Sequence, residues 1–594
     1  MKKGCIFLSA LLAACLFFQP AVVTALAAED ADTTVTVDYT DGDRKVTVGN
    51  ISSSDNGLVV DSSVASDHNA TVTVEGNITA GSAGLIPTRT GDGETTVSVD
   101  GTITAGSYGV YASGDGGAQT ITTGDINADD DGVYIETYGG TQKIATGNIS
   151  STYDDGLGVE AGGGITTVTT GDITSSDDAV MCFLWNDSIA EVTTGNINAG
   201  YWGIDVEAED SSNLMIKAGD IASREDGIQV WAADDAFVSV TAGNVTTQED
   251  HGIQVWAGGD AFVSVTAGNV TTQDEHGINV ETAQNAVVHV NVNDVTGAEY
   301  GINMDAGEES TMDILVTGSL TGQDAAINAY DTETFSHVDL TVWKIETTEA
   351  GDIPVLVGGS ADESAEAFKE KINYIIYLEQ PTKGATLSAT DENGNSLAQR
   401  HDHSVAAEGD TVLLKVDLQK GFRLLSAYNG KGEKTDLVKD SAGNYYVVVP
   451  RGGGIYLSVE LEKLPDPKPA PKPAPTPAPT PGKKSSGGST EAVSAPPVND
   501  YAVFNQQAAA AILAAAPAET VSISTTEWIS IYHVVTDALK QRPDVSLKIT
   551  FLYEGQFFSV IIPAGADVDA LLDQNGFAGF LHLATVLGTE PVQQ

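Results

Sequence analysis

The sequence has very little cysteine for its length of 594 residues. Only three cysteines occur, and two of them, Cys5 and Cys15, lie in the apolar N-terminal segment. Cys182 has no partner in the rest of the chain, which excludes an intramolecular disulfide framework and leaves packing as the source of stability. Because Cys182 stands in the apolar run Val180–Leu184, we expect a buried residue rather than a catalytic thiol.

Positive charge is also scarce. Lysine and arginine number 28 against 83 aspartates and glutamates, a formal net charge of −55 at pH 7. The imbalance is concentrated between Glu29 and Asp352, where about 55 acidic residues accompany seven basic ones. Nucleic acid and anionic lipid are disfavoured as partners, because both are bound through Lys and Arg. No apolar run of about 18 residues follows the N-terminal segment, so we expect no transmembrane segment in the mature chain.

The N-terminal segment has the pattern of an export signal. Lys2 and Lys3 precede an apolar run that ends at Phe18, and a small-residue motif follows at 25–27. This order predicts a signal peptide over residues 1–27 and a secreted or cell-wall-associated protein. An alternative is a lipoprotein box that ends at Cys15. The chain stays apolar after Cys15, whereas a lipidated chain usually becomes polar there, so we favour cleavage after Ala27.

A glycine recurs about every 24 residues between residues 49 and 318, and a second small residue follows it eight or nine positions later. The first series is Gly49, Gly76, Gly101, Gly124, Gly147, Gly171, Gly195, Gly219, Gly243, Gly268 and Gly318. The second series is Gly57, Gly84, Gly109, Gly132, Gly156, Ala179, Gly203, Gly227, Gly252, Gly277, Gly301 and Ala326.

Apolar and polar residues alternate between these small residues, as in the segment 238–241. This period of two predicts short β-strands with one buried face, which must stack on neighbouring repeats to bury enough surface. A pair such as Gly243-Asn244 predicts a sharp corner with positive φ. A helix is excluded by the frequent glycine, and a β-sandwich would not give such constant spacing.

The repeat V-x-V-x-x-G-[ND]-[IV]-x-[AST], then G-[IV]-x-V, resembles the right-handed parallel β-helix (pectin-lyase-like) superfamily, as used in bacterial surface adhesins. The resemblance covers about residues 34–360 and implies about 13 coils. It also implies the handedness, which the spacing does not give. We therefore expect a mainly β protein with a parallel β-helix over residues 28–360. A non-enzymatic, adhesin-like protein that binds glycan or host and matrix material is the favoured function.

The alternative function is a polysaccharide lyase or glycoside hydrolase of the same superfamily. Lyases resembling this fold use Arg or Lys as a base, but the basic residues here are scattered: Arg44, Lys45, Arg89, Lys143, Lys217, Arg224 and Lys344. Hydrolases resembling it carry N-T-D, D-D, H-G and R-I-K motifs. Only fragments occur, namely Asp234-Asp235, His251-Gly252 and His276-Gly277. We therefore predict no catalytic residues.

Acidic residues cluster just before the second small residue of several repeats. Stacked coils would bring these like charges about 5 Å apart, and a hard cation would relieve the repulsion. The sequence therefore predicts weak Ca²⁺ binding, with a hydrated acidic edge as the alternative and no other cofactor. The candidate ligands are Asp130, Asp131, Asp154, Asp155, Asp177, Asp178, Asp250 and Asp274.

Tryptophans supply a candidate ligand surface. Trp231 and Trp256 occupy equivalent positions in two nearly identical repeats and should stack, and Trp202 lies one repeat earlier. Since Ile228 and Val230 should point inward, we expect Trp231 to point outward. These three tryptophans are candidates for binding carbohydrate, with purely structural stacking as the alternative.

Residues 361–463 should form a helical cap at 361–370 and a small β module. The module's G-D-x-V, G-[YF] and Y-x-x-x-V-P segments resemble the internalin B-repeats of Gram-positive surface proteins, with Val449 where those have Met. Residues 464–499 form a Pro/Ser/Gly-rich linker, whose alternating prolines predict an extended rod. An L-P-x-T-G sorting signal is absent.

Residues 500–594 should form a small α/β domain. We expect helices at 506–516 and 527–541, the second capped by Ser524-Thr525-Thr526, and a hairpin of 545–553 with 557–562. The domain resembles an uncharacterised C-terminal module of secreted clostridial proteins. The shared motifs are Trp528, R-P-D-V at 542–545 and I-P-A-G-A-D at 562–567, and they imply no activity.

Overall fold

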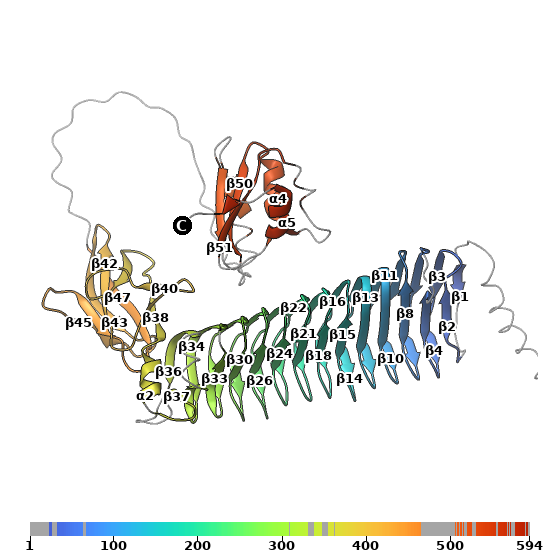
Figure 1. Ribbon diagram of the computed structural model, residues 1–594, viewed down its shortest axis with the longest axis horizontal. Helices are drawn as coiled ribbons and strands as arrows, with labels where there is room; N and C mark the ends of the chain where they lie inside the picture. Colours follow the sequence, from blue (N-terminus) through green and yellow to red (C-terminus); the bar gives the residue numbers. More distant parts are fainter. Residues whose placement is uncertain are drawn as a thin grey trace, which may run out of the picture. The chain divides into compact units, whose positions relative to one another are not determined.

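A long parallel β-solenoid dominates the computed structural model (Figure 1). The structure describes residues 23–26, residues 32–464 except 63–66, 308, 331–337, 347–354 and 362, and much of 505–591. The signal peptide, apart from residues 23–26, and the proline-rich linker after Leu464 lie outside the described residues. The chain divides into two compact units, Met1–Pro469 and Ala470–Gln594, each described by itself.

Each turn of the solenoid contributes to three parallel sheets. The first sheet contains β1 (Val23–Leu26), β3 (Arg44–Val48), β6 (Ala70–Val74), β9 (Glu94–Val99), β11 (Val110–Thr123), β13 (Val133–Ala145), β16 (Ile165–Thr169), β19 (Ile189–Thr193), β22 (Asn213–Lys217), β25 (Phe237–Thr241), β28 (Phe262–Thr266), β31 (Val287–Val292), β34 (Thr311–Gly322), β36 (Val338–Glu346) and β38 (Ile372–Leu378).

The second sheet is built from very short strands: β4 (Ile51–Ser53), β7 (Ile78–Ala80), β10 (Ile103–Ala105), β12 (Ile126–Ala128), β14 (Ile149–Ser151), β17 (Ile173–Thr174), β20 (Ile197–Asn198), β23 (Ile221–Ala222), β26 (Val245–Thr247), β29 (Val270–Thr272) and β32 (Val295–Gly297). The ends of β34 and β36 extend it.

The third sheet contains β2 (Val35–Asp38), β5 (Leu58–Ser62), β8 (Leu85–Thr90), the first halves of β11 and β13, β15 (Leu157–Ala161), β18 (Val180–Leu184), β21 (Ile204–Ala208), β24 (Ile228–Ala232), β27 (Ile253–Ala257), β30 (Ile278–Thr282), β33 (Tyr300–Ala306), β35 (Ala325–Ala329) and β37 (Val355–Val357).

The stack is longer than the roughly 13 coils expected from the glycine series. In the first sheet, β1 pairs in parallel with β3 and lies within the predicted signal peptide. At the other end, β38 pairs in parallel with β36, so Ile372 sits over Leu340. The glycine series underestimated the ladder because strands at the ends pair without the full repeat motif.

Identical apolar residues stack on one another inside the solenoid. In the second sheet Ile103 pairs with Ile126, which pairs with Ile149, and all three are buried. The alternation predicted for Val238–Thr241 is confirmed, since Val238 and Val240 are buried and Ser239 is not. Cys182 is fully buried in β18, and this burial raises the pKa of its thiol, as expected for a core residue.

The first corner, between the first and second sheets, is held by a ladder of Asn and Asp side chains. The Oδ1 atom of Asn148 accepts a hydrogen bond from the backbone N–H of Asp172 in the next coil at 2.9 Å, and Asp172 Oδ1 accepts one from Asn196 at 2.7 Å. The same bond recurs along the stack at 2.7–3.3 Å.

The prediction of positive φ at this corner is wrong. None of the corner glycines, such as Gly171, is among the described residues with positive φ. They are glycines because a Cβ at Gly171 would lie 2.3 Å from Asn148 Oδ1 in the preceding coil. Positive φ occurs instead at the third corner, between the third and first sheets, at Asp210, Asp234 and Gly259.

The β module continues from the solenoid rather than standing apart. Helix α2 (Glu363–Lys369) contacts β37 and buries Phe368, while β38 is at once a rung of the first sheet and a strand of the module. The other module strands are β39 (Ala385–Thr390), β40 (Ala398–Arg400), β41 (His403–Ala406), β42 (Thr411–Leu418), β43 (Phe422–Asn429), β44 (Thr435–Asp436), β45 (Val438–Lys439), β46 (Tyr445–Val448) and β47 (Ile455–Lys463).

The C-terminal unit has a sheet in the order β48-β50-β51-β53, with a two-stranded ladder of β49 and β52. Its elements are β48 (Thr520–Thr525), β49 (Ser530–Tyr532), α4 (His533–Gln541), β50 (Ser546–Tyr553), β51 (Gln556–Ile562), β52 (Phe577–Gly579), α5 (Phe580–Leu587) and β53 (Glu590–Pro591).

The predicted start of the second helix is wrong. The expected capping residues Ser524 and Thr525 belong to β48, and α4 begins only at His533 because residues 530–532 pair with β52. The expected hairpin is present as β50 and β51. Among the described residues, no helix has both the length and the apolar character needed to cross a membrane.

Candidate functional site

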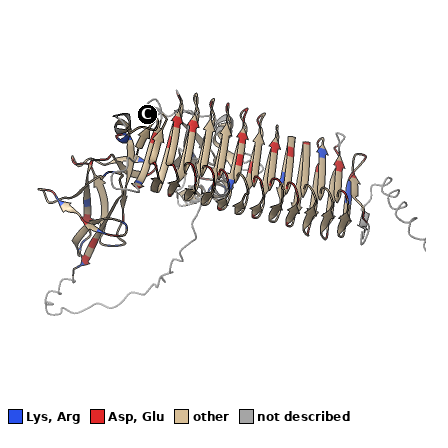
Figure 2. Cartoon of the chain, turned by 90° about the horizontal axis from the view of Figure 1, so that it is seen from below, with Lys and Arg blue, Asp and Glu red and all other residues tan. Residues whose placement is uncertain are grey.

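The second corner, between the second and third sheets, carries most of the candidate metal ligands. Asp130 and Asp131 lie in one coil, Asp154 and Asp155 in the next, and Asp177 and Asp178 in the one after. Single carboxylate oxygens of Asp131, Asp154 and Asp155 lie within 4.8 Å of one another. The structure therefore brings these six residues onto one edge, and Figure 2 shows acidic residues on successive coils with few basic ones.

Half of these carboxyls point into the protein. Asp131, Asp155 and Asp178 are buried, and burial raises their pKa values to about 6, about 8 and about 7, with like charges adding to the shift at Asp155. Asp155 Oδ1 accepts the backbone N–H of Asp178 at 3.2 Å, and Asp178 Oδ1 accepts that of Trp202 at 3.1 Å. The side chains of Asp155 and Asp178 therefore continue the backbone ladder. A cation would have to displace the protons that the buried carboxyls hold below their raised pKa values.

Asp250 and Asp274 lie farther along the same corner. Asp250 forms a cluster with Asp226 and His251, whose ligand atoms lie within 4.8 Å of one another. Asp274 is exposed and belongs to none of the three clusters found among the described residues. The eight candidate ligands thus do not form one site.

The histidines of this corner were not among the ligands predicted from the sequence. His251 and His276 stack with ring centroids 4.9 Å apart and planes at 9°. His276 lies beside two carboxylates, with Nδ1 3.7 Å from Glu299 and 4.0 Å from Glu275. The sequence signal for them is the repeated acid-His-Gly triplet at 250–252 and 275–277, whose His-Gly pair also occurs in the hydrolase motif.

The tryptophans fall into two separate places. Trp231 and Trp256 are paired in register on the outer face of the third sheet, pointing outward and stacked as expected, with centroids 4.8 Å apart and planes at 6°. Both side chains are half-buried. At that separation the rings must overlap face to face, so much of each ring face is already covered. Trp202 lies at the second corner, where it packs on Tyr201 at 4.7 Å.

An aromatic group near the N-terminal end was missed. Tyr111 and Tyr134 stack at 5.8 Å on the outer face of the third sheet, with Tyr108 against both rings. The hydroxyl of Tyr111 donates to Glu136 at 2.7 Å. The alternating segment V-Y-A at 110–112 and its counterpart V-Y-I at 133–135 were the available signal.

The fragments of a hydrolase motif do not meet. Asp234-Asp235 lie in the turn between β24 and β25, at the third corner, whereas His251 and His276 precede β27 and β30 at the second. The basic residue nearest the N-terminal end of the third sheet is not available as a catalytic base either. Arg89 is buried at 1% exposure, with guanidinium N–H groups donating to the carbonyls of Gly91 and His68.

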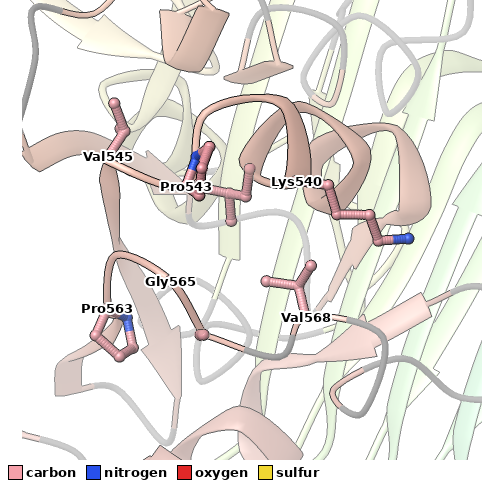
Figure 3. Close-up of a pocket in the computed structure, with 8 residues that line it drawn as sticks. Lys540, Pro543, Val545, Pro563, Gly565 and Val568 are labelled. Carbon is pink, nitrogen blue, oxygen red and sulfur yellow. The ribbon is translucent and has the colours of Figure 1, made fainter.

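In the C-terminal unit, two of the motifs noted in the sequence meet at one cleft. The turn at 542–545 and the loop at 562–567 face each other across a cavity of about 210 Å³ (Figure 3). It is lined by Leu539, Lys540, Pro543, Val545, Pro563, Gly565, Ala566 and Val568. Apart from Lys540, which is the only charged group among these residues, the lining residues have apolar side chains or none, but polar atoms form about half of the lining surface.

Comparison with protein-family models, with curated proteins and with solved structures found no match for this chain. The parallel β-solenoid itself is evident from its strand pairing. The resemblances to adhesin-type β-helices, internalin B-repeats and the clostridial module stay expectations from the sequence.

Proposed function

We propose that this chain is an exported, non-enzymatic protein of the cell surface or its surroundings, adhesin-like, which binds carbohydrate on the outer face of the third sheet. The observation that supports this most is a row of side-chain amides along that face. Asn303 donates to Asn279 at 2.9 Å, and Asn328 donates to Asn303 at 2.7 Å. Partly exposed amides in line present donors and acceptors on successive coils between Gln229 and Asn328, as recognition of sugar hydroxyls requires.

Aromatic side chains border this row. Gln229 and Gln254 belong to it, and Trp231 and Trp256 stand two positions along the same strands, on the same face. Because the two indoles cover each other, a sugar would contact their edges and the outer ring faces rather than a broad platform. The outer face of each indole is flanked by a glutamate of the adjacent coil: Glu207 pairs with Trp231, and Glu281 pairs with Trp256.

An enzyme of the polysaccharide lyase or glycoside hydrolase type is the alternative. It needs an acid or base close to a second charged group. The separation of Asp234-Asp235 from His251 and His276, and the burial of Arg89, speak against it. The sparse basic residues also favour binding over elimination chemistry.

A glycan array followed by a reducing-sugar release assay tests this proposal. We expect saturable binding to at least one glycan class, lost or at least tenfold weaker in Gln254→Ala combined with Trp256→Ala. The matched control is Phe262→Ala, which removes one ring of a stacked pair on the first sheet, with its partner Phe237 at 5.2 Å. Release of reducing or unsaturated ends would establish the enzyme instead, and equal weakening by the control would overturn the assigned face.

Weak Ca²⁺ binding at the second corner remains a second proposal. It is supported by the proximity of Asp131, Asp154 and Asp155. The pKa values of Asp131 and Asp155, raised to about 6 and about 8, imply that binding improves as pH rises through this range and levels off above it, because Ca²⁺ takes ionised carboxylates.

A further inference from the structure

A cluster of one histidine and two glutamates stands at the second corner, apart from the surface proposed for carbohydrate. Glu275 and His276 are adjacent in one coil, and Glu299 belongs to the next. One ligand atom from each lies within 4.8 Å of the others. The Nδ1 atom of His276 is 3.7 Å from Glu299 Oε2 and 4.0 Å from Glu275 Oε2.

His276 differs from the other polar residues at this position in the stack. At several coils the side chain at this position accepts a hydrogen bond from the backbone N–H of the equivalent residue in the next coil. The acceptors are Asn56, Asp155, Asp178, Asp226 and His251, and the backbone donors are Ala83, Asp178, Trp202, His251 and His276 in the same order. The series stops at His276. His276 as a whole is only 9% exposed. Its Nδ1 is shielded from solvent and has no hydrogen-bond partner among the described residues.

A buried ring nitrogen without a partner is costly, and here it faces carboxylate oxygens. Burial lowers the pKa of His276, which favours the neutral imidazole with a lone pair to offer, although Glu299 and Asp250 oppose the shift. Burial and the neighbouring Glu299 raise the pKa of Glu275. The ring itself is held between His251 and Tyr300, each with its centroid 4.9 Å away.

We propose that His276 Nδ1, Glu275 and Glu299 bind a divalent transition metal ion of the Zn²⁺ class. Ligand atoms that lie about 2.0–2.2 Å from Zn²⁺ are about 3.4 Å apart in a tetrahedron. The distances of 3.7 Å and 4.0 Å need only a small contraction to reach this geometry. A nitrogen ligand with two carboxylates suits Zn²⁺ or Co²⁺ better than Ca²⁺, which takes oxygen ligands.

The related cluster one coil earlier is a weaker candidate. Asp226, Asp250 and His251 are similarly placed, but His251 Nδ1 already accepts the backbone N–H of His276 at 3.4 Å. A metal at His251 would have to break this rung of the ladder, whereas a metal at His276 would not.

The test is a titration of the purified chain, without a polyhistidine tag, with Zn²⁺ by calorimetry and with Co²⁺ by visible absorption. We expect one saturable site, a visible band of Co²⁺ with nitrogen and oxygen ligands, and a Zn²⁺-induced rise in melting temperature. His276→Gln and Glu299→Gln should each weaken Zn²⁺ binding at least tenfold. Glu281→Gln removes an exposed acid from the following strand and should leave binding within twofold of wild type.

Asp226→Asn removes a ligand of the earlier cluster alone, so it discriminates between the two clusters and should keep the Co²⁺ band. Melting in EDTA shows whether each variant is folded, so loss of binding by unfolding is recognised. The proposal is overturned if wild type shows no saturable binding of Zn²⁺, if His276→Gln binds as well as wild type, or if Glu281→Gln or Asp226→Asn loses the site to the same degree.

Discussion

The buried carboxylate of Asp155 accepts the backbone N–H of Asp178, one coil along the solenoid, at 3.2 Å. The same corner residue in the next coil, Asp178, does so in turn for Trp202. A charged carboxylate in this position gains a hydrogen bond and loses hydration, and the raised pKa values show that lost hydration has the larger effect.

This relationship predicts that the solenoid becomes more stable as pH falls from 8 to 5. The folded-state pKa of Asp155 is about 8 and that of Asp178 about 7, against 3.8 for the free group, so the folded state holds more protons across this window. Stability therefore declines as pH rises through it. Thermal melts should show a fall of a few degrees or more from pH 5 to pH 8.

Asp155→Asn keeps an acceptor but removes the charge, and should stabilise the protein at pH 8 by about 1 kcal/mol or more while flattening the pH dependence. Asp172→Asn serves as control, because it removes an exposed acid from a ladder in which asparagine already occurs. A pH profile unchanged by Asp155→Asn would contradict the assignment.

The corner glycines predict a difference between two identical substitutions. Gly171→Ala places a Cβ 2.3 Å from Asn148 Oδ1, which forces this side chain away from the N–H of Asp172. We expect a loss of about 2 kcal/mol or more in the free energy of unfolding. Gly49→Ala, at the same repeat position, meets nothing within 4 Å and should change stability by less than about 0.5 kcal/mol. Denaturant titration of both variants measures the difference.

Stacking of Trp231 on Trp256 should be measurable as coupling. A double-mutant cycle with Trp231→Ala and Trp256→Ala should give an interaction energy of about 0.5–1.5 kcal/mol, the range for aromatic pairs. The same cycle on Trp202 and Trp256, which lie on different parts of the surface, should give coupling near zero. Coupling of equal size in both cycles would mean that the variants disturb the whole solenoid.

Besides the shared strand β38, an ion pair with a titratable histidine connects the module to the solenoid. His401, in the turn between β40 and β41, forms an ion pair through Nε2 with Asp313 Oδ1 of β34 at 2.8 Å, and the interaction with Asp313 raises the pKa of His401. His289 also faces Asp313, and Arg400 pairs with Asp339 beside it. A raised folded-state pKa gives stability that is present below about pH 6.5 and lost as pH rises through the folded value.

His401→Gln should therefore lower stability at pH 6 by about 1 kcal/mol and have little effect at pH 9. Hydrogen exchange of β40 and β41 at the two pH values reports the local effect directly. His68→Gln, at the far end of the solenoid, is the control. Equal protection of β40 and β41 at pH 6 in wild type and His401→Gln would refute the prediction.

Addition of Ca²⁺ at millimolar concentration should raise the melting temperature at pH 8.5 and have less effect at pH 6, where the buried carboxyls hold protons. Asp154→Asn should reduce the shift, because this residue borders both Asp131 and Asp155. A melting temperature independent of Ca²⁺ at both pH values would leave a hydrated acidic edge as the explanation.

The sequence by itself determined the repeat. Alternation at Val238–Thr241 placed every second side chain inside, and the spacing of small residues required stacked coils, because such short strands bury too little alone. Local patterns also located the outward Trp231 and the buried Cys182. The orientation of these side chains depends only on residues nearby in the chain or one repeat away, so it can be predicted from one sequence.

Only the tertiary structure decided which side chains meet across coils. It showed that Gly171 is small to admit Asn148 rather than to adopt positive φ, that β38 prolongs the stack into the module, and that Asp234 and His251 occupy different corners. It also showed that His276 Nδ1 accepts no backbone N–H from the next coil, whereas Asp226 and His251 at the equivalent position do. Such contacts depend on the register and on the angle of each corner, which arise from packing of whole turns rather than from any local pattern.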